Sequence, residues 1–418
     1  MKKIFLLILL WVLPAYSQEY TENNTSYDIN WADVNAKNND GETALIAASK
    51  LNDYKTVKRL IDAGADVNAK NNDGETALIA ATQIGNDEAD DNCYNNYGHY
   101  TILCLKPIEI IDVSDIIKAL IAAGADVNAK NNYGETALIS ASNVIINDET
   151  TKLLVDAGAD VNAKDNNGMT ALIAAGLRGD DNKVKLLLDA GADINAKDNN
   201  GMTALLAAST KLGSYNRVKL LIDAGADVNA KNNNGTTALI EASVGQADYE
   251  TVKLLIEAGA DVNAKNNNGT TALIESSSTR YYSFSKSIAK LLLDAGADVN
   301  IKNNDGMTAL IKASSTRNYE LIEALIAAKA DVNAKNNDGT TALIEALSTD
   351  NSFSEDIAKL LIDAGADVNI KNHDDTTALL VAAKHGMLST VNLLIRAGAN
   401  KNVKDKKGKT LKDYIPSY

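Results

Sequence analysis

The sequence predicts an all-α fold: a solenoid of about ten stacked helix–turn–helix units joined by β-hairpin-like turns. Two short phrases recur along the 418 residues, and they support this prediction together. The first phrase, Ala-Gly-Ala-Asp-Val-Asn-Ala-Lys, is complete at 63–70, 123–130, 157–164, 224–231 and 258–265. The second, Thr-Ala-Leu followed by Ile or Leu, begins at Thr43 and recurs up to Thr377. A self-similar period of this length is typical of a solenoid.

The spacing between the two phrases separates packed structure from surface loops. From the Ala that opens the first phrase to the next Thr is always 13 residues, as from Ala63 to Thr76. The return distance is 20 or 21 residues in seven cases and longer in three. Variable lengths belong to surface connections. The three longer returns therefore predict insertions at 83–113, Tyr281–Ser287 and Asn351–Glu355, all at the same place in their repeats.

The residues 38–70 show how one repeat is expected to fold. Asn and Asp before Gly at 38–41 are turn chemistry, and Thr43 is a candidate N-cap of a first helix. The second helix carries Val57, Leu60 and Ile61 at i, i+3 and i+4, which predicts one buried stripe. Stacking of such units would align the leucines of the second phrase into a continuous buried ladder.

A glycine is expected to end each second helix in the left-handed conformation. Lys329 stands where the other nine repeats have this Gly, and Asp375 replaces the Gly of the turn. Both residues are therefore expected to be strained, Asp375 less so because Asp tolerates positive φ better.

The pattern resembles the ankyrin repeat family, a unit of a β-turn and two helices. The matching residues are the Gly41-x-Thr43-x-Leu45 start, the small pair Ala47-Ala48 and the end from Leu60 to Ala69. The resemblance runs from about Ala32 to the C-terminus. Where the family usually has Pro and His, this chain has Ala44 and Ile46. The resemblance implies protein binding and no catalysis.

The two ends of the chain differ from the repeats. Residues 1–17 resemble a secretory signal peptide, with Lys2 and Lys3 before an apolar run at Ile4–Leu13 that is too short to span a bilayer. Residues 18–37 are expected to be an N-terminal cap and partial repeat, 38–403 the repeat array, and 404–418 a C-terminal capping partial repeat. We therefore expect an exported protein, periplasmic or extracellular, without membrane insertion after cleavage. Richness in Lys, Asn and Ile suggests a bacterial source.

Composition and motifs exclude several functions. The net charge of −14 argues against nucleic-acid binding, which needs Lys and Arg against phosphates. The histidines His99, His373 and His385 share no spacing, so neither a catalytic nor a metal site is expected. Asp-x-Asn in every repeat fits a backbone-bonding turn better than calcium binding. We expect no enzyme activity and no cofactor.

Two surfaces remain open as binding sites for a protein partner. One is an aromatic rim on the smaller insertions, formed by Tyr281, Tyr282, Phe284 and Phe353. Its rings make good anchors if they are exposed, but they could equally fold back on their own repeat. The other follows the residue after Thr-Ala-Leu-Ile, which in the family borders the concave groove. This place is small in the first half of the chain and becomes Glu241, Glu275, Lys312 and Glu345 in the second.

The cysteines, Cys93 and Cys104, both lie in the longest insertion. Export would place them in an oxidising compartment, so we expect a disulfide between them; two reduced thiols are the alternative. The sequence thus predicts an exported, non-enzymatic, monomeric scaffold for a protein partner. The alternative is a structural, envelope-stabilising protein without one dedicated partner.

Overall fold

The structure of the protein is a computed structural model that describes residues 33–83, 112–144, 147–210, 213–244, 248–278, 282–348 and 354–416. Within these ranges every named element is a helix, and the isolated β-bridge pairs Lys37 with Thr43. The chain divides into two compact units, Met1–Ala208 with Asp223–Ala226, and Ser209–Ile222 with Asp227–Tyr418. The predicted fold class, a helical repeat solenoid, is confirmed, and each unit is described by itself.

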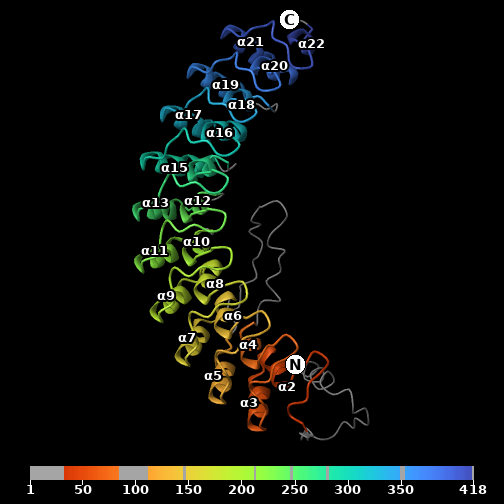
Figure 1. Ribbon diagram of the computed structural model, residues 1–418, viewed down its shortest axis with the longest axis vertical. Helices are drawn as coiled ribbons and strands as arrows, with labels where there is room; N and C mark the ends of the chain where they lie inside the picture. The colour runs from red at the N-terminus through yellow and green to blue at the C-terminus, as the bar shows by residue number, and fades with distance from the viewer. Residues whose placement is uncertain are drawn as a thin grey trace. The chain divides into compact units, whose positions relative to one another are not determined.

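In unit 1 the helices alternate between two layers, each in contact with the next repeat (Figure 1). The first helices of its repeats are α2 (Ala44–Lys50), α4 (Ala77–Thr82), α6 (Ala137–Asn143), α8 (Ala171–Arg178) and α10 (Ala204–Ser209). The second helices are α3 (Tyr54–Asp62), α5 (Ser114–Ala122), α7 (Asp148–Asp156) and α9 (Asp181–Asp189). First helices pack on first helices and second helices on second helices, as α2 does on α4 and α3 on α5.

Unit 2 repeats the same arrangement. Its first helices are α12 (Ala238–Ala242), α14 (Ala272–Ser276), α16 (Ala309–Thr316), α18 (Ala342–Ala346), α20 (Ala378–Lys384) and the terminal α22 (Leu411–Tyr414). Its second helices are α11 (Tyr215–Asp223), α13 (Tyr249–Glu257), α15 (Tyr282–Asp294), α17 (Tyr319–Ala327), α19 (Ser354–Asp363) and α21 (Leu388–Arg396). Consecutive first helices from α12 to α22 contact each other, and so do consecutive second helices from α13 to α21.

Threonine begins the first helices, as predicted. Thr43 has an extended backbone, and its hydroxyl accepts a hydrogen bond from the Ile46 N–H at 3.3 Å, which satisfies a donor that the helix leaves free. Eight other repeats, from Thr76 to Thr341, form the same bond. Thr377 is the exception, because its buried hydroxyl has no partner.

Leucine and isoleucine that follow this cap form the core between first helices. Leu45 and Ile46 are buried, as are their counterparts in every repeat that the structure describes. Burying a side chain of this size contributes about 1.5–3 kcal/mol. Val57 and Leu60 of the second helix are buried too, whereas Ile61 is only half-buried. The predicted ladder of apolar residues therefore holds neighbouring repeats together within each unit.

Asparagine ties one repeat to the next by a contact that the repeat pattern alone did not predict. The Asp66 carboxylate accepts the Asn68 N–H at 2.9 Å, which is the expected turn bond. The Asn68 amide then reaches the following repeat, where it donates to the Gly124 carbonyl at 3.1 Å and accepts the Asp126 N–H at 2.7 Å. The same pair of bonds recurs at Asn128 and Asn162 in unit 1. In unit 2 it recurs at Asn229, Asn263, Asn333 and Asn369.

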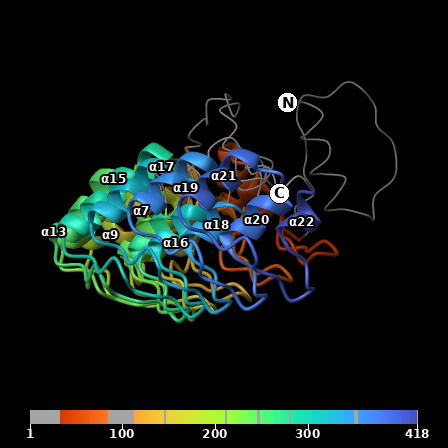
Figure 2. The ribbon, with the colours of Figure 1, turned by 90° about the horizontal axis from the view of Figure 1, so that it is seen from above.

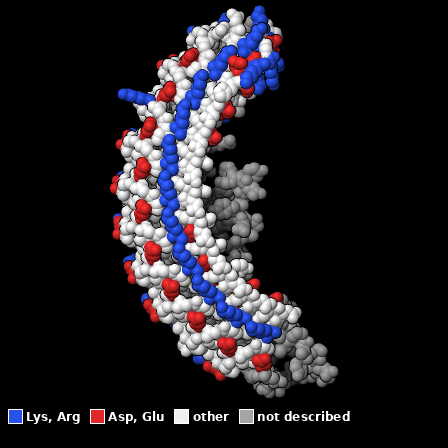
Figure 3. Space-filling model, viewed as in Figure 1, with Lys and Arg blue, Asp and Glu red and all other residues white. Residues whose placement is uncertain are grey.

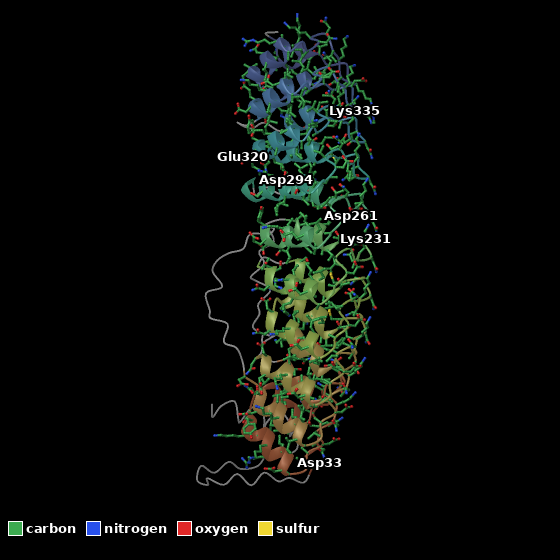
Figure 4. The ribbon with its side chains drawn as sticks, turned by 90° about the vertical axis from the view of Figure 1, so that its left-hand side faces the viewer. Asp33, Lys231, Asp261, Asp294, Glu320 and Lys335 are labelled. Atoms are coloured by element: carbon green, nitrogen blue, oxygen red, sulfur yellow. The ribbon has the colours of Figure 1, made fainter. Side chains whose placement is uncertain are left out.

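Lysines form a second line of contacts between the turns of neighbouring repeats in each unit. Figure 2 shows these turns as loops beside the helices. Lys70 Nζ donates to the main-chain oxygen of Lys130 at 2.8 Å, and Lys130 Nζ donates to Lys164 at 2.7 Å. In unit 2, Lys231 and Lys302 make the same bond to the lysine that follows. Figure 3 shows these side chains as a line of basic residues in each unit. In unit 2, Lys231, Asp261 and Lys335 lie along the turn-bearing edge and Glu320 on the opposite, helical side (Figure 4).

The turn glycines have two reasons to lack a side chain: their φ is positive, and the next repeat leaves no room for a Cβ. Gly41 has φ +73, and a Cβ on it would lie 2.5 Å from the Asn72 Oδ1 of the following repeat. Asp375 takes the glycine place with φ 55. The repeat that follows Asp375 carries Lys406 where most others have this Asn, so the side chain of Asp375 does not meet an amide oxygen there.

One predicted loop is wrong. Residues 282–287 of the insertion at Tyr281–Ser287 belong to α15, which has 13 residues where α13 has nine. No Gly or Pro interrupts this stretch, so the extra residues lengthen the helix at its start. The insertion at Asn351–Glu355 likewise enters α19 at Ser354. The helices α4 and α5 flank the long insertion, whose residues 84–111, with Cys93 and Cys104, lie outside the described residues, as do residues 1–32.

The left-handed conformation of Lys329 is confirmed, with φ 67, and its N–H closes the helix end on the Ile326 carbonyl at 2.9 Å. Because a side chain is strained there, Lys329→Gly should raise the free energy of unfolding by about 1 kcal/mol. Denaturant unfolding of both proteins measures this. Lys329→Ala keeps the Cβ and should leave the midpoint unchanged; an equal gain from both substitutions would contradict strain as the cause.

Candidate functional site

Four charged side chains occupy the same place on consecutive first helices of unit 2, and we call them the charged row. Glu241 lies on α12, Glu275 on α14, Lys312 on α16 and Glu345 on α18. Each comes directly after a buried Ile that fixes the helix against its neighbours, and each is itself half-buried. The fold thus brings together residues that are up to 104 positions apart, from 241 to 345 in the sequence.

Burial and mutual charge set the electrostatics of the charged row. Burial raises the pKa of Glu241 above its usual range, and the negative charge of Glu275 raises it further. Burial also raises the pKa of Glu275 and of Glu345, although Lys312 lowers both in part. Glu241 and Glu275 thus lie close enough to interact electrostatically, as Lys312 does with Glu275 and with Glu345.

The described side chains of the charged row form no ion pair with one another. Among the described residues, no nitrogen–oxygen pair within 4.0 Å joins any two of the four side chains. Lys312 has a carboxylate on each side, whereas Glu241 has only Glu275 as its neighbour in the row. The surplus of negative charge therefore lies at the Glu241 end, where the site can accept a cationic group.

The corresponding place in unit 1 carries small residues. They are Ala47, Ala80, Ser140, Ala174 and Ala207, of which all but the half-buried Ala47 are buried. In unit 2 the row ends at Val381, which is 9% exposed. Charge at this position is thus confined to four consecutive repeats of unit 2.

The structure describes the aromatic rim only in part. Tyr282 and Phe284 lie in the added turn of α15, and Tyr281 and Phe353 lie outside the described residues. No side-chain position of these four residues is described. The structure therefore brings together the charged row, and the rim as a whole stays a prediction from the sequence.

Sequence reasoning missed a cluster of charges in unit 1. Lys50 Nζ lies 2.6 Å from Glu42 Oε1 and 3.2 Å from Glu75 Oε2, and the Asn71 amide donates to Glu75 at 2.9 Å. Burial would lower the pKa of Lys50, but the two carboxylates outweigh it and the pKa is raised. The sequence held a sign of this cluster, because Glu42 and Glu75 each come directly before a capping Thr. Both carboxylates of the cluster are already paired with Lys50, so it offers less to a partner than the charged row.

Lys183 was also missed, because nothing in the sequence separates it from the exposed lysines. Its side chain is 1% exposed, and Nζ donates to the Val144 carbonyl at 2.8 Å beside Asp180 at 3.4 Å. Burial lowers its pKa, although Asp180 opposes the shift. This lysine ties α9 to the end of α6 and is closed to a ligand.

Two further findings concern the described residues only. No group of three or more His, Cys, Asp or Glu side chains is placed there to hold a metal ion. Nor is any helix of that part of the chain long and apolar enough to cross a membrane.

Comparison with protein families agrees with the geometry. The model of ankyrin repeats in three copies matches residues 18–89 and then overlapping stretches at 110–198, 144–232, 173–266, 205–303, 279–372 and 334–405. The chain belongs to the ankyrin repeat family, whose repeats are protein–protein interaction modules. None of the curated proteins compared with the chain matches it.

Raised carboxylate pKa values make a testable statement about stability. A Glu whose folded pKa lies above its usual value opposes folding once ionised, so the penalty is absent at low pH and complete above the folded pKa. Glu241→Gln should therefore raise the free energy of unfolding near neutral pH and leave it unchanged at about pH 3, where both states are protonated. Denaturant unfolding at both pH values measures this, with Glu323→Gln on the exposed face of α17 as a control. A gain of the same size at both pH values would contradict the role of charge.

Proposed function

We propose that the protein is a non-enzymatic scaffold that binds a protein partner through the charged row of unit 2. The observation that carries this proposal is a half-buried line of four charges with no internal ion pair. Half-buried charges cost stability unless they are paired, so a sequence that places them on consecutive repeats favours a role in recognition. In the family this place borders the concave groove, which is where we propose the partner lies.

Other surfaces are weaker candidates for the same role. The cluster around Lys50 already pairs its own charges, and the corresponding place in the rest of unit 1 is filled by small buried side chains. The lysines of the turns already donate to main-chain oxygens of the neighbouring repeats. The aromatic rim remains the competing surface, and the experiment below includes it.

Reversing charge at the Glu241 end should weaken binding of the partner. We expect Glu241→Lys with Glu275→Lys to reduce capture of the partner at least tenfold, because like charges across an interface are strongly unfavourable. Quantitative affinity capture with cross-linking, from cells that produce the protein, measures this, and circular dichroism checks that the helices are retained.

The matched control is Glu250→Lys with Glu323→Lys, which makes the same charge change on exposed positions of α13 and α17. A third variant, Tyr281→Ser with Tyr282→Ser and Phe284→Ser, tests the rim. If only the rim variant loses the partner, the charged row is not the binding surface. If no variant captures a stoichiometric partner, and neither does the unaltered protein, the envelope-stabilising alternative is favoured.

We propose further that the protein is exported to the periplasm or the medium. The basic pair Lys2-Lys3, the apolar run Ile4–Leu13 and the small residues at Ala15–Ser17 support this. Export in turn supports the disulfide between Cys93 and Cys104, which lie in a polar insertion with few apolar residues of its own.

The predicted disulfide closes a short loop and should contribute roughly 2.5–3 kcal/mol of local stability. We expect no free thiol at Cys93 or Cys104 in the exported protein and an N-terminus near Gln18, both measured by mass spectrometry under non-reducing conditions. Cys93→Ser with Cys104→Ser should keep its helical content and lose protease resistance only within 83–113. Thiol labelling at both positions would show the alternative, two reduced cysteines.

A further inference from the structure

The spacing of the charged row is set by helix packing. The row residues share one place on α12, α14, α16 and α18, and each of these helices contacts the next. Axes of packed α-helices lie about 8–10 Å apart. The four charges therefore recur about every 8–10 Å, and the three intervals from Glu241 to Glu345 span about 24–30 Å.

Only some backbone conformations of a bound peptide bring side chains to one face at intervals of about 8–10 Å. A polyproline II segment rises about 3.1 Å per residue with three residues per turn, so every third side chain faces the same way at about 9.3 Å. A β-strand brings side chains to one face at about 6.6–6.8 Å, which is too short. An α-helix comes closest with every seventh residue, at about 10.5 Å, and drifts beyond the upper limit over three intervals. The row thus matches the period of polyproline II.

The order of charges along the row is asymmetric. From α12 to α18 it reads acidic, acidic, basic, acidic. A partner that pairs each position must present basic, basic, acidic and basic side chains in that order. Any other arrangement of the same four charges brings like charges together at two positions, which is unfavourable in a half-buried site.

Resting on the proposed function, we propose that the partner segment is a polyproline II stretch of about ten residues with a charged side chain at every third position, ordered basic, basic, acidic, basic. Its basic pair lies against Glu241 and Glu275, its acidic residue against Lys312, and its last basic residue against Glu345. For a given segment, the charge order fixes its register and the direction in which it runs along the row.

Synthetic peptides test this directly. The first is Lys-Pro-Ala-Lys-Pro-Ala-Glu-Pro-Ala-Lys, and the second is its reversed sequence, since either chain direction is compatible with the row. The control has the same composition with Glu at the last charged position, which leaves two like-charge contacts in either direction. Fluorescence anisotropy of labelled peptides with the full chain should show one of the first two binding about tenfold more tightly than the control. The difference should vanish at 1 M salt, where charges are screened within about 3 Å.

The Lys312→Glu protein provides the reciprocal control. Its row is acidic throughout, so the matched and control peptides each make one like-charge contact, and the preference should disappear. A helical peptide with the same charges at every seventh residue completes the set. Equal binding of matched and control peptides, absence of binding, or tighter binding of the helical peptide would each overturn the inference.

These outcomes are distinguishable from failure of the proposed function. If the partner is still captured after Glu241→Lys with Glu275→Lys, the charged row is not the binding surface and the proposed function fails. If capture is lost on charge reversal but the peptides do not discriminate, the row binds the partner and only the conformation and charge order inferred for its segment are wrong.

Discussion

A single repeat of this protein has too few residues to form a core of its own, so its stability comes from the repeats on either side. Leu45 and Ile46 bury their side chains among neighbouring first helices, and their counterparts do the same. Asn68 adds polar specificity, because its amide fits between a carbonyl and an N–H of the next repeat only when the two repeats are in register. Apolar burial supplies most of the free energy, and the amide fixes the register between repeats.

This constraint divides the positions of a repeat into two kinds. Positions that contact the neighbouring repeat are filled uniformly, because a change there disturbs two interfaces at once. The turn glycines belong to this group, since a Cβ on Gly41 would meet Asn72 of the next repeat. The place after Thr-Ala-Leu-Ile is filled differently from repeat to repeat, with Ala47 in the first and Glu241 or Lys312 in later ones. Variation at this place is therefore available for recognition.

The charged row illustrates how function and stability compete in such an array. Burial raises the pKa of Glu241, Glu275 and Glu345, which means that the ionised carboxylates oppose folding. The rest of each repeat offsets this cost through its buried leucine and isoleucine. The unit 1 cluster is different, because Lys50 stabilises both Glu42 and Glu75. A carboxylate that is paired with a lysine of its own chain is less available to a charged group of a partner.

The sequence by itself determined the fold class, the threonine caps of the first helices and the strained Lys329. These features depend on contacts within a repeat or on the regular spacing of the repeats, which is visible in the sequence. It also determined that Glu241 and its counterparts share one face. The tertiary structure alone decided that the Asn68 amide reaches the next repeat, that Tyr282 extends a helix, and that Lys50 and Lys183 are paired. These features depend on distances between residues of different repeats, or on competition between helix and loop, and residue spacing encodes neither.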